Sequence, residues 1–171
     1  MAGLSRPSDA AGLLDFGQND VIQLEEVPRR TVIGKTRTVK WANVATEIAA
    51  MRTEARDHFA KTGATGGREV SSYSNTGAEG SDVTVGLEVS DATGSPALSD
   101  GFTASLMAVP GQYLRDDHAS APGFAPWVTF MSRIPKMGYV AKEPYMTFEV
   151  YSGTGGKESV TMYAGVTKAE K

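Results

Sequence analysis

This chain contains an internal repeat, which limits the folds that are open to it. The dipeptide Val-Pro occurs at 27–28 and again at 109–110, and the motif YSNTG at 73–77 is matched by YSGTG at 151–155. Motifs of this kind also suit ordinary hairpin turns, so coincidence is one explanation. The motifs and the predicted elements keep the same order in both parts of the chain, which favours a duplication.

The first half, residues 21–91, has the pattern strand, helix, strand and strand. Its opening stretch is rich in β-branched side chains and is interrupted by Pro28, which is typical of strands or of one bent strand. Apolar side chains then recur at steps of three and four residues from Trp41 to Phe59, which predicts an amphipathic helix that ends at Gly63. The predicted strands lie at 21–39, 69–73 and 82–89.

The second half, residues 101–168, repeats this order. A helix is predicted to begin at Pro126, because proline suits the first turn, and to end between Ile134 and Gly138. The predicted strands and extended segments lie at 102–109, 112–115, 145–151 and 159–166.

Two such copies predict an α+β fold. Duplicated strand–helix–strand–strand units would form one antiparallel sheet with both helices on one face. The groove between two neighbouring helices is then the expected place for a ligand. Residues 1–20 are rich in Ala, Gly, Ser and Asp, and we expect a flexible or loosely docked arm there, followed by one domain over 21–168.

Composition excludes several kinds of site. The chain has no cysteine and 2 histidines, which excludes disulfides, thiol nucleophiles and a histidine-rich metal site. Its net charge of -3 gives no basic surface for nucleic acid. No apolar run approaches the ~20 residues that a membrane span needs. We therefore expect a cytoplasmic protein without metal or cofactor, bound neither to nucleic acid nor to a membrane, whose open sheet edge could form a homodimer.

One predicted strand presents a carboxylate among aromatic rings. Side chains alternate between the faces of a strand, so Tyr145, Thr147, Glu149 and Tyr151 share one face. Burying an unpaired carboxylate is costly, and a cationic ligand would offset that cost. Ring faces would add a cation–π attraction of about 0.5–2 kcal/mol each. The alternative is a glutamate on the solvent-facing side of a half-exposed strand.

Other aromatic side chains are candidates for the walls of the groove. Trp41 opens the first helix and Trp127 opens the second, so the two occupy comparable places in the two halves. They form either two walls for a flat ligand or parts of the core. For any single tyrosine, structural packing is the alternative. The candidate ligand-binding residues are Glu149, Trp41, Trp127, Tyr113, Tyr145, Tyr151 and Phe148.

Five segments, taken in order, carry a family resemblance. They are Val27-Pro28, Val109-Pro110-Gly111-Gln112-Tyr113, the helix from Trp127 toward Gly138-Tyr139, Phe148-Glu149-Val150-Tyr151, and the last strand at 160–166. Over about residues 21–167 the chain resembles the GyrI-like family, which is also known as the effector-binding domain of AraC/Rob-type and MerR-type multidrug regulators.

The resemblance implies a fold, a ligand class and a role for one residue. Such domains are duplicated strand–helix–strand–strand units that bind lipophilic, often cationic drugs in the central groove. Their glutamate on the penultimate strand corresponds to Glu149. Some standalone members hydrolyse cyclopropane-bearing DNA-alkylating natural products, and others are linked to gyrase protection. This sequence departs from the regulators by lacking an attached DNA-binding domain, and from the shortest members by its linker at 91–101 and its long first helix.

Three functions follow as hypotheses. The first is a standalone protein that binds an amphipathic aromatic compound through Glu149. The second is a hydrolase of a reactive cyclopropane-bearing natural product that confers self-resistance, with Glu149 as the base or water-orienting group, since burial would raise its pKa. The third is a gyrase-protecting module that binds a protein partner.

Overall fold

The computed structural model describes residues 13–15, 21–63, 67–89, 98–118, 124–142, 146–153 and 158–171. The first half contains β1 (Leu13–Asp15), β2 (Val21–Val27), β3 (Arg30–Lys40), the 3-10 helix η1 (Trp41–Asn43), α1 (Val44–Thr62), β4 (Glu69–Ser74) and β5 (Gly80–Val89). The second half contains β6 (Thr103–Ala108), β7 (Gly111–His118), α2 (Phe124–Arg133), the 3-10 helix η3 (Pro135–Met137), β8 (Tyr139–Ala141), β9 (Thr147–Ser152) and β10 (Ser159–Lys168).

The repeat that the sequence predicts is present in the sheet. The strands pair antiparallel in one 10-stranded sheet of order β1-β2-β7-β10-β9-β4-β5-β3-β6, with β8 attached to β10. β3 and β7 each pair with the last strand of their own half, whereas β2 and β6 each pair with the other half. The halves are therefore related by an approximate twofold axis between β4 and β9, which pair at the centre.

Each half begins with a long extended segment that a proline divides. Pro28 separates β2 from β3, and Pro110 separates β6 from β7. Proline has no N–H to donate to a sheet ladder, so pairing is interrupted where it stands. The interruption lets the two parts of each long segment pair with different halves of the molecule.

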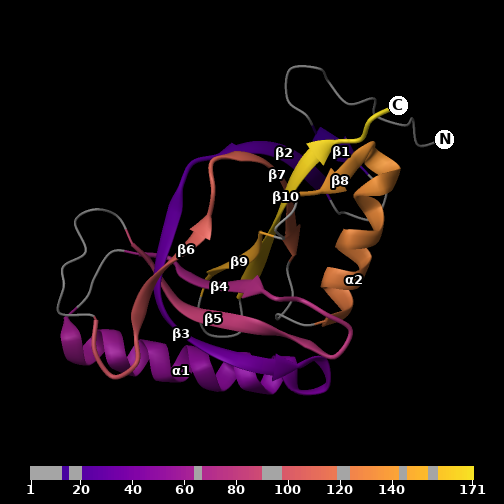
Figure 1. The fold of residues 1–171 in the computed structure, drawn as a ribbon. Coiled ribbons are helices and arrows are strands. Elements are labelled where there is room, and N and C mark those ends of the chain that lie inside the picture. The colour runs from indigo at the N-terminus through magenta and orange to yellow at the C-terminus, as the bar shows by residue number, and fades with distance from the viewer. Residues whose placement is uncertain are drawn as a thin grey trace.

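Both helices cover the same face of the sheet. α1 ends at Gly63, whose positive φ of 68° is the left-handed conformation that favours glycine. Ile48 of α1 and Phe130 of α2 belong to one buried cluster with side chains of the sheet. Figure 1 shows α1 (purple) and α2 (orange) as separate helices beside the curved sheet. The predicted α+β architecture is confirmed.

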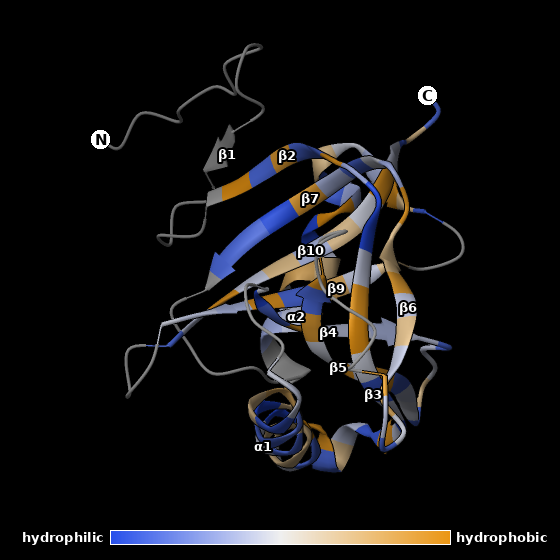
Figure 2. Cartoon of the chain, turned by 90° about the vertical axis from the view of Figure 1, so that its left-hand side faces the viewer, coloured by the Kyte–Doolittle hydropathy of each residue, from blue (hydrophilic) through white to orange (hydrophobic). Residues whose placement is uncertain are grey.

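The opposite face of the sheet is also buried, because the sheet curls over it. The second buried cluster consists of Val27, Val32, Val70, Met107, Ala108, Tyr113, Phe148, Val150 and Tyr163. Figure 2 shows the curvature, with hydrophobic and hydrophilic residues interspersed along the strands. The sheet therefore separates two cores, and the parity of a residue in its strand decides which core it joins.

The chain outside the paired halves is described only in part. Of the predicted arm at 1–20, the described residues are Leu13–Asp15, which pair with β2. Residues 91–97 of the predicted linker lie outside the described residues. The assignment of one domain over 21–168 stays a prediction. In the part of the chain that the structure describes, no helix combines the length and the hydrophobicity needed to cross a membrane.

Candidate functional site

The centre of the sheet forms the floor between the two helices. Where β4 and β9 pair, Ser71 lies opposite Glu149, and Tyr73 lies opposite Thr147. Alternation places all four side chains on the same face, together with Tyr151 further along β9. Ser71 and Tyr73 are the repeat equivalents of Glu149 and Tyr151. The twofold axis therefore pairs a hydroxyl in one half with a carboxylate in the other.

The Glu149 carboxylate is fully buried and is held by neutral donors. Its exposed fraction is 0%. The Trp127 indole N–H donates to Oε1, and the Tyr151 hydroxyl donates to Oε2 over 2.5 Å. Ser71 Oγ lies 2.7 Å from the same tyrosine hydroxyl. Because that hydroxyl donates to Glu149, Ser71 acts as donor to it, and the three groups form a chain from β4 to β9.

The electrostatics of Glu149 are dominated by burial. Burial raises the pKa of this carboxyl, and hydrogen bonds from Tyr151, Trp127 and Tyr73 oppose the rise without cancelling it. Among the described residues, no lysine or arginine forms an ion pair with it. Burial likewise raises the pKa of the Tyr151 hydroxyl well above its usual range. The site is therefore a buried acid that gains further stabilisation when a positive charge approaches.

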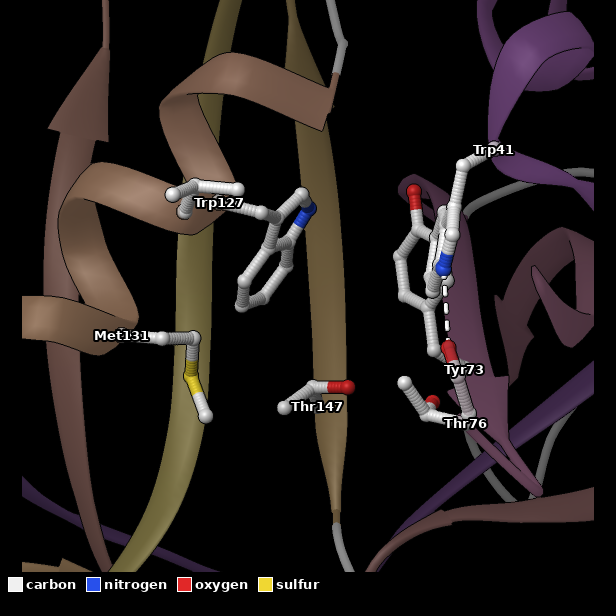
Figure 3. Close-up of a pocket in the computed structure, with 8 residues that line it drawn as sticks. Trp41, Tyr73, Thr76, Trp127, Met131 and Thr147 are labelled. Atoms are coloured by element: carbon white, nitrogen blue, oxygen red, sulfur yellow. Dashed lines mark hydrogen bonds between the residues drawn. The ribbon is translucent and has the colours of Figure 1, made fainter. Parts of the chain in front are cut away.

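An aromatic pocket of about 430 Å³ adjoins this acid. Trp127 from α2 and Trp41 from η1 face each other across it, and Thr147 lies on the floor between them (Figure 3). The Tyr73 ring meets the Trp127 ring edge to face at 5.6 Å between centroids. The Trp41 indole N–H donates to the Gly77 carbonyl over 2.8 Å, which fixes its ring. The lining residues are Trp41, Tyr73, Thr76, Gly77, Trp127, Val128, Met131 and Thr147.

The other end of the floor is occupied by Arg52 of α1. Its guanidinium carbon lies 3.9 Å from the centroid of the Tyr151 ring. It donates to Glu69 on β4 and to Glu158, which directly precedes β10. Arg52 is 6% exposed, so the cation is buried against the tyrosine and linked to both halves of the chain.

The structure brings together four of the predicted site residues, and their roles in binding stay predictions. Glu149, Trp127 and Tyr151 are linked by hydrogen bonds, and Trp41 lies across the pocket. Tyr145 lies outside the described residues.

Tyr113 and Phe148 do not join this site, which corrects the sequence analysis. Phe148 neighbours Glu149 on β9, so alternation turns it to the opposite face. There it stacks on Tyr163 at 4.5 Å between ring centroids and lies 5.7 Å from Tyr113. The Tyr113 hydroxyl donates to the Val109 carbonyl over 3.0 Å. Both rings belong to the second core, and they face away from the helices.

Sequence reasoning missed residues that the repeat could have supplied. Tyr73 stands in YSNTG where Tyr151 stands in YSGTG, so a role for one tyrosine implied a role for the other. Arg52 lies four residues after Ile48 and three before Ala55, within the apolar stripe of α1. A charged residue in such a stripe signals a buried ion pair.

A second pocket of about 440 Å³ is lined largely by residues of α1. Its lining residues are Lys35, Ala50, Thr53, Glu54, Asp57, His58, Lys61, Asp100 and Phe102. Charged groups of both signs dominate it, and Lys35 is already paired with Glu54 at 2.5 Å. The aromatic pocket is therefore the better candidate for an organic ligand.

The duplicated sheet, with two helices over one face and an aromatic pocket between them, has the GyrI-like, effector-binding type of fold, as the sequence resemblance predicts. Among solved structures, SAV2435 bound to tetraphenylphosphonium matches with a TM-score of 0.61 and 9% identity, covering 85% of this chain and 93% of that chain. The EcmrR C-terminal domain matches with a TM-score of 0.66 and 13% identity, covering 89% and 100%.

EcmrR in a complex with DNA matches with a TM-score of 0.65 and 13% identity. That match covers 88% of this chain and 58% of the EcmrR chain. No protein-family model matches the chain, and no curated protein sequence matches it significantly. At sequence identities this low, the structural similarity shows a shared fold.

Proposed function

We propose that this protein binds an amphipathic aromatic cation in the pocket between Trp41 and Trp127, with Glu149 as the source of negative charge. The observation that carries the proposal is a fully buried carboxylate whose hydrogen-bond donors, Trp127 and Tyr73, are themselves walls of the pocket. A solved structure of the same fold, SAV2435, is bound to the lipophilic cation tetraphenylphosphonium.

The geometry favours a cation over a neutral or anionic ligand. A ring that donates a hydrogen bond to a carboxylate becomes richer in electrons, so its face attracts positive charge more strongly. The Trp127 indole and the Tyr73 phenol both stand in this relation to Glu149. A cation between the rings would also offset the cost of keeping the acid buried and ionised.

The size and chemistry of the pocket set the rest of the ligand. A volume of about 430 Å³ accommodates a molecule with several rings. Met131 adds a polarizable, adaptable contact, and Thr76 and Thr147 add hydroxyl groups. The ligand class is therefore a bulky aromatic cation with few polar groups.

Intrinsic fluorescence tests the proposal, because both of the chain's 2 tryptophans line the pocket. Tetraphenylphosphonium should change the emission of the wild type saturably. Glu149→Gln should weaken the affinity by about tenfold or more, which corresponds to the loss of one charge-assisted contact. Neutral triphenylphosphine oxide should bind both forms equally.

Glu47→Gln is the matched control, since it removes the same charge from a half-exposed position on α1. Its affinity for tetraphenylphosphonium should equal that of the wild type. Equal cation affinity in Glu149→Gln and the wild type would contradict the role of this carboxylate. If a cyclopropane-bearing natural product is supplied instead, a product heavier by one water that the wild type forms and Glu149→Gln does not would indicate a hydrolase.

A further inference from the structure

The two ends of the groove are closed to different degrees. Along β9, Thr147 marks the aromatic end and Tyr151 marks the other end, with Glu149 between them. The aromatic pocket lies at the Thr147 end. At the Tyr151 end, the guanidinium of Arg52 covers the tyrosine ring and bridges Glu69 and Glu158.

The charges along the groove are arranged in a fixed order. Glu149 supplies one negative charge at the centre, and its repeat equivalent Ser71 supplies none. Arg52 supplies a positive charge on the far side of Tyr151, and a guanidinium keeps this charge at all physiological pH values. Its partners Glu69 and Glu158 are more exposed, with side chains 20% and 29% exposed, so the guanidinium lies deeper than the two carboxylates.

On the basis of the proposed function, we propose that Arg52 is a specificity-determining residue that limits the groove to ligands with one cationic head. Its side chain fills the Tyr151 end, and its charge repels a second cation that would follow the first past Glu149. Without Arg52, the same end would hold two carboxylates, Glu69 and Glu158, that have lost their buried counter-ion and keep only the exposed Arg56. The groove would then offer a second acidic position at a distance from the aromatic pocket.

A matched pair of probes tests this inference. Butyl(triphenyl)phosphonium carries one cationic head, and butane-1,4-diylbis(triphenylphosphonium) carries two. In the wild type, the two-headed probe should bind about twofold more tightly, the statistical factor for two equivalent heads that enter one at a time. In Arg52→Gln, the preference for the two-headed probe should rise to about tenfold or more, since a second charged contact forms.

Arg56→Gln is the control, because Arg56 contacts the same Glu69 and Glu158 from a side chain that is 57% exposed. It should keep the wild-type preference. An unchanged preference in Arg52→Gln, while the one-headed probe still binds, would overturn the role of Arg52 and leave the proposed function intact. A wild type that already prefers the two-headed probe by about tenfold would overturn it without any variant. A wild type that binds neither probe would overturn the proposed function, and this inference with it.

Discussion

The two ends of the groove are built from equivalent strands, yet the helices complete them differently. At one end, Trp127 of α2 packs on Tyr73, and a pocket remains. At the other end, Arg52 of α1 packs on Tyr151, and its ion pairs fill the space. The duplicated frame thus carries an aromatic pocket at one end and a clamp of buried ion pairs at the other, and each end combines residues of both halves.

Removing the clamp should cost the most stability. Arg52→Ala leaves Glu69 and Glu158 without their buried partner, and we expect the free energy of unfolding to fall by about 3 kcal/mol. Arg56→Ala, in the same network but exposed, should cost less than about 1 kcal/mol. Urea denaturation measures both. Equal costs for the two variants would mean that the ion pairs of Arg52 stabilise the protein no more than those of an exposed arginine. The Tyr151 end would then not be a clamp.

The two equivalent tyrosines should respond unequally to loss of the hydroxyl. Tyr151→Phe leaves both Ser71 and Glu149 short of a partner, and should cost about 2 kcal/mol. Tyr73→Phe removes one of several donors around Glu149 and should cost about 1 kcal/mol. The same denaturation experiment ranks them. A larger cost for Tyr73→Phe would place the structural centre of the network at the aromatic end.

The central acid Glu149 and the clamp acid Glu158 should give opposite pH dependence of stability. Burial raises the pKa of Glu149 in the folded state, so the folded protein binds more protons than the unfolded chain above the usual glutamate pKa. The contribution of Glu149 to stability should therefore fall as the pH rises from the usual glutamate pKa through the higher pKa of the folded state. The hydrogen bond from Arg52 lowers the pKa of Glu158, so its contribution should be lost as the pH falls through the lowered value.

Melting temperatures of Glu149→Gln and Glu158→Gln across the acid-to-neutral range measure these contributions. The melting temperature of Glu149→Gln should rise relative to that of the wild type as the pH rises. As the pH falls, the melting temperature of Glu158→Gln should decrease less than that of the wild type. If the melting temperatures of both variants changed relative to the wild type in the same direction with pH, Glu149 and Glu158 would not lie in the different environments described above.

The smallest effect should come from the rim of the aromatic end. Trp41→Phe keeps an aromatic wall but loses the indole hydrogen bond to Gly77, which lies at an exposed position. We expect the affinity for tetraphenylphosphonium to fall about twofold, equivalent to about 0.5 kcal/mol. Fluorescence of the remaining Trp127 reports the binding. A loss as large as that of Glu149→Gln would make this tryptophan a principal contact.

The fold was predictable because its signals are local and occur twice. The prolines at 28 and 110 interrupt the paired segments, Gly63 ends the first helix, and the two YSxTG motifs begin at the ends of the equivalent strands β4 and β9. Each of these signals acts through the backbone of its own neighbourhood, so a reader of the sequence can apply it without knowing the tertiary structure.

The site was only partly predictable, because it depends on contacts between distant residues. Alternation placed Glu149 and Tyr151 on one face, and the same rule should have removed Phe148. The exclusion of Tyr113 needed knowledge that the opposite face is a second core, which follows from the curl of the sheet. The partners of Arg52 lie on β4 and before β10, and no local pattern connects them.

The exchange of β2 and β6 between the halves has a consequence for how the chain folds. Ile22 of the first half pairs with Asp116 of the second, and Ala108 of the second pairs with Arg30 of the first. Neither repeat can complete its hydrogen-bond ladder alone, so the native state requires closure of long loops, which is slow. A segment corresponding to one repeat would present unsatisfied strand edges and associate with its counterpart, so the protein should melt in a single cooperative transition.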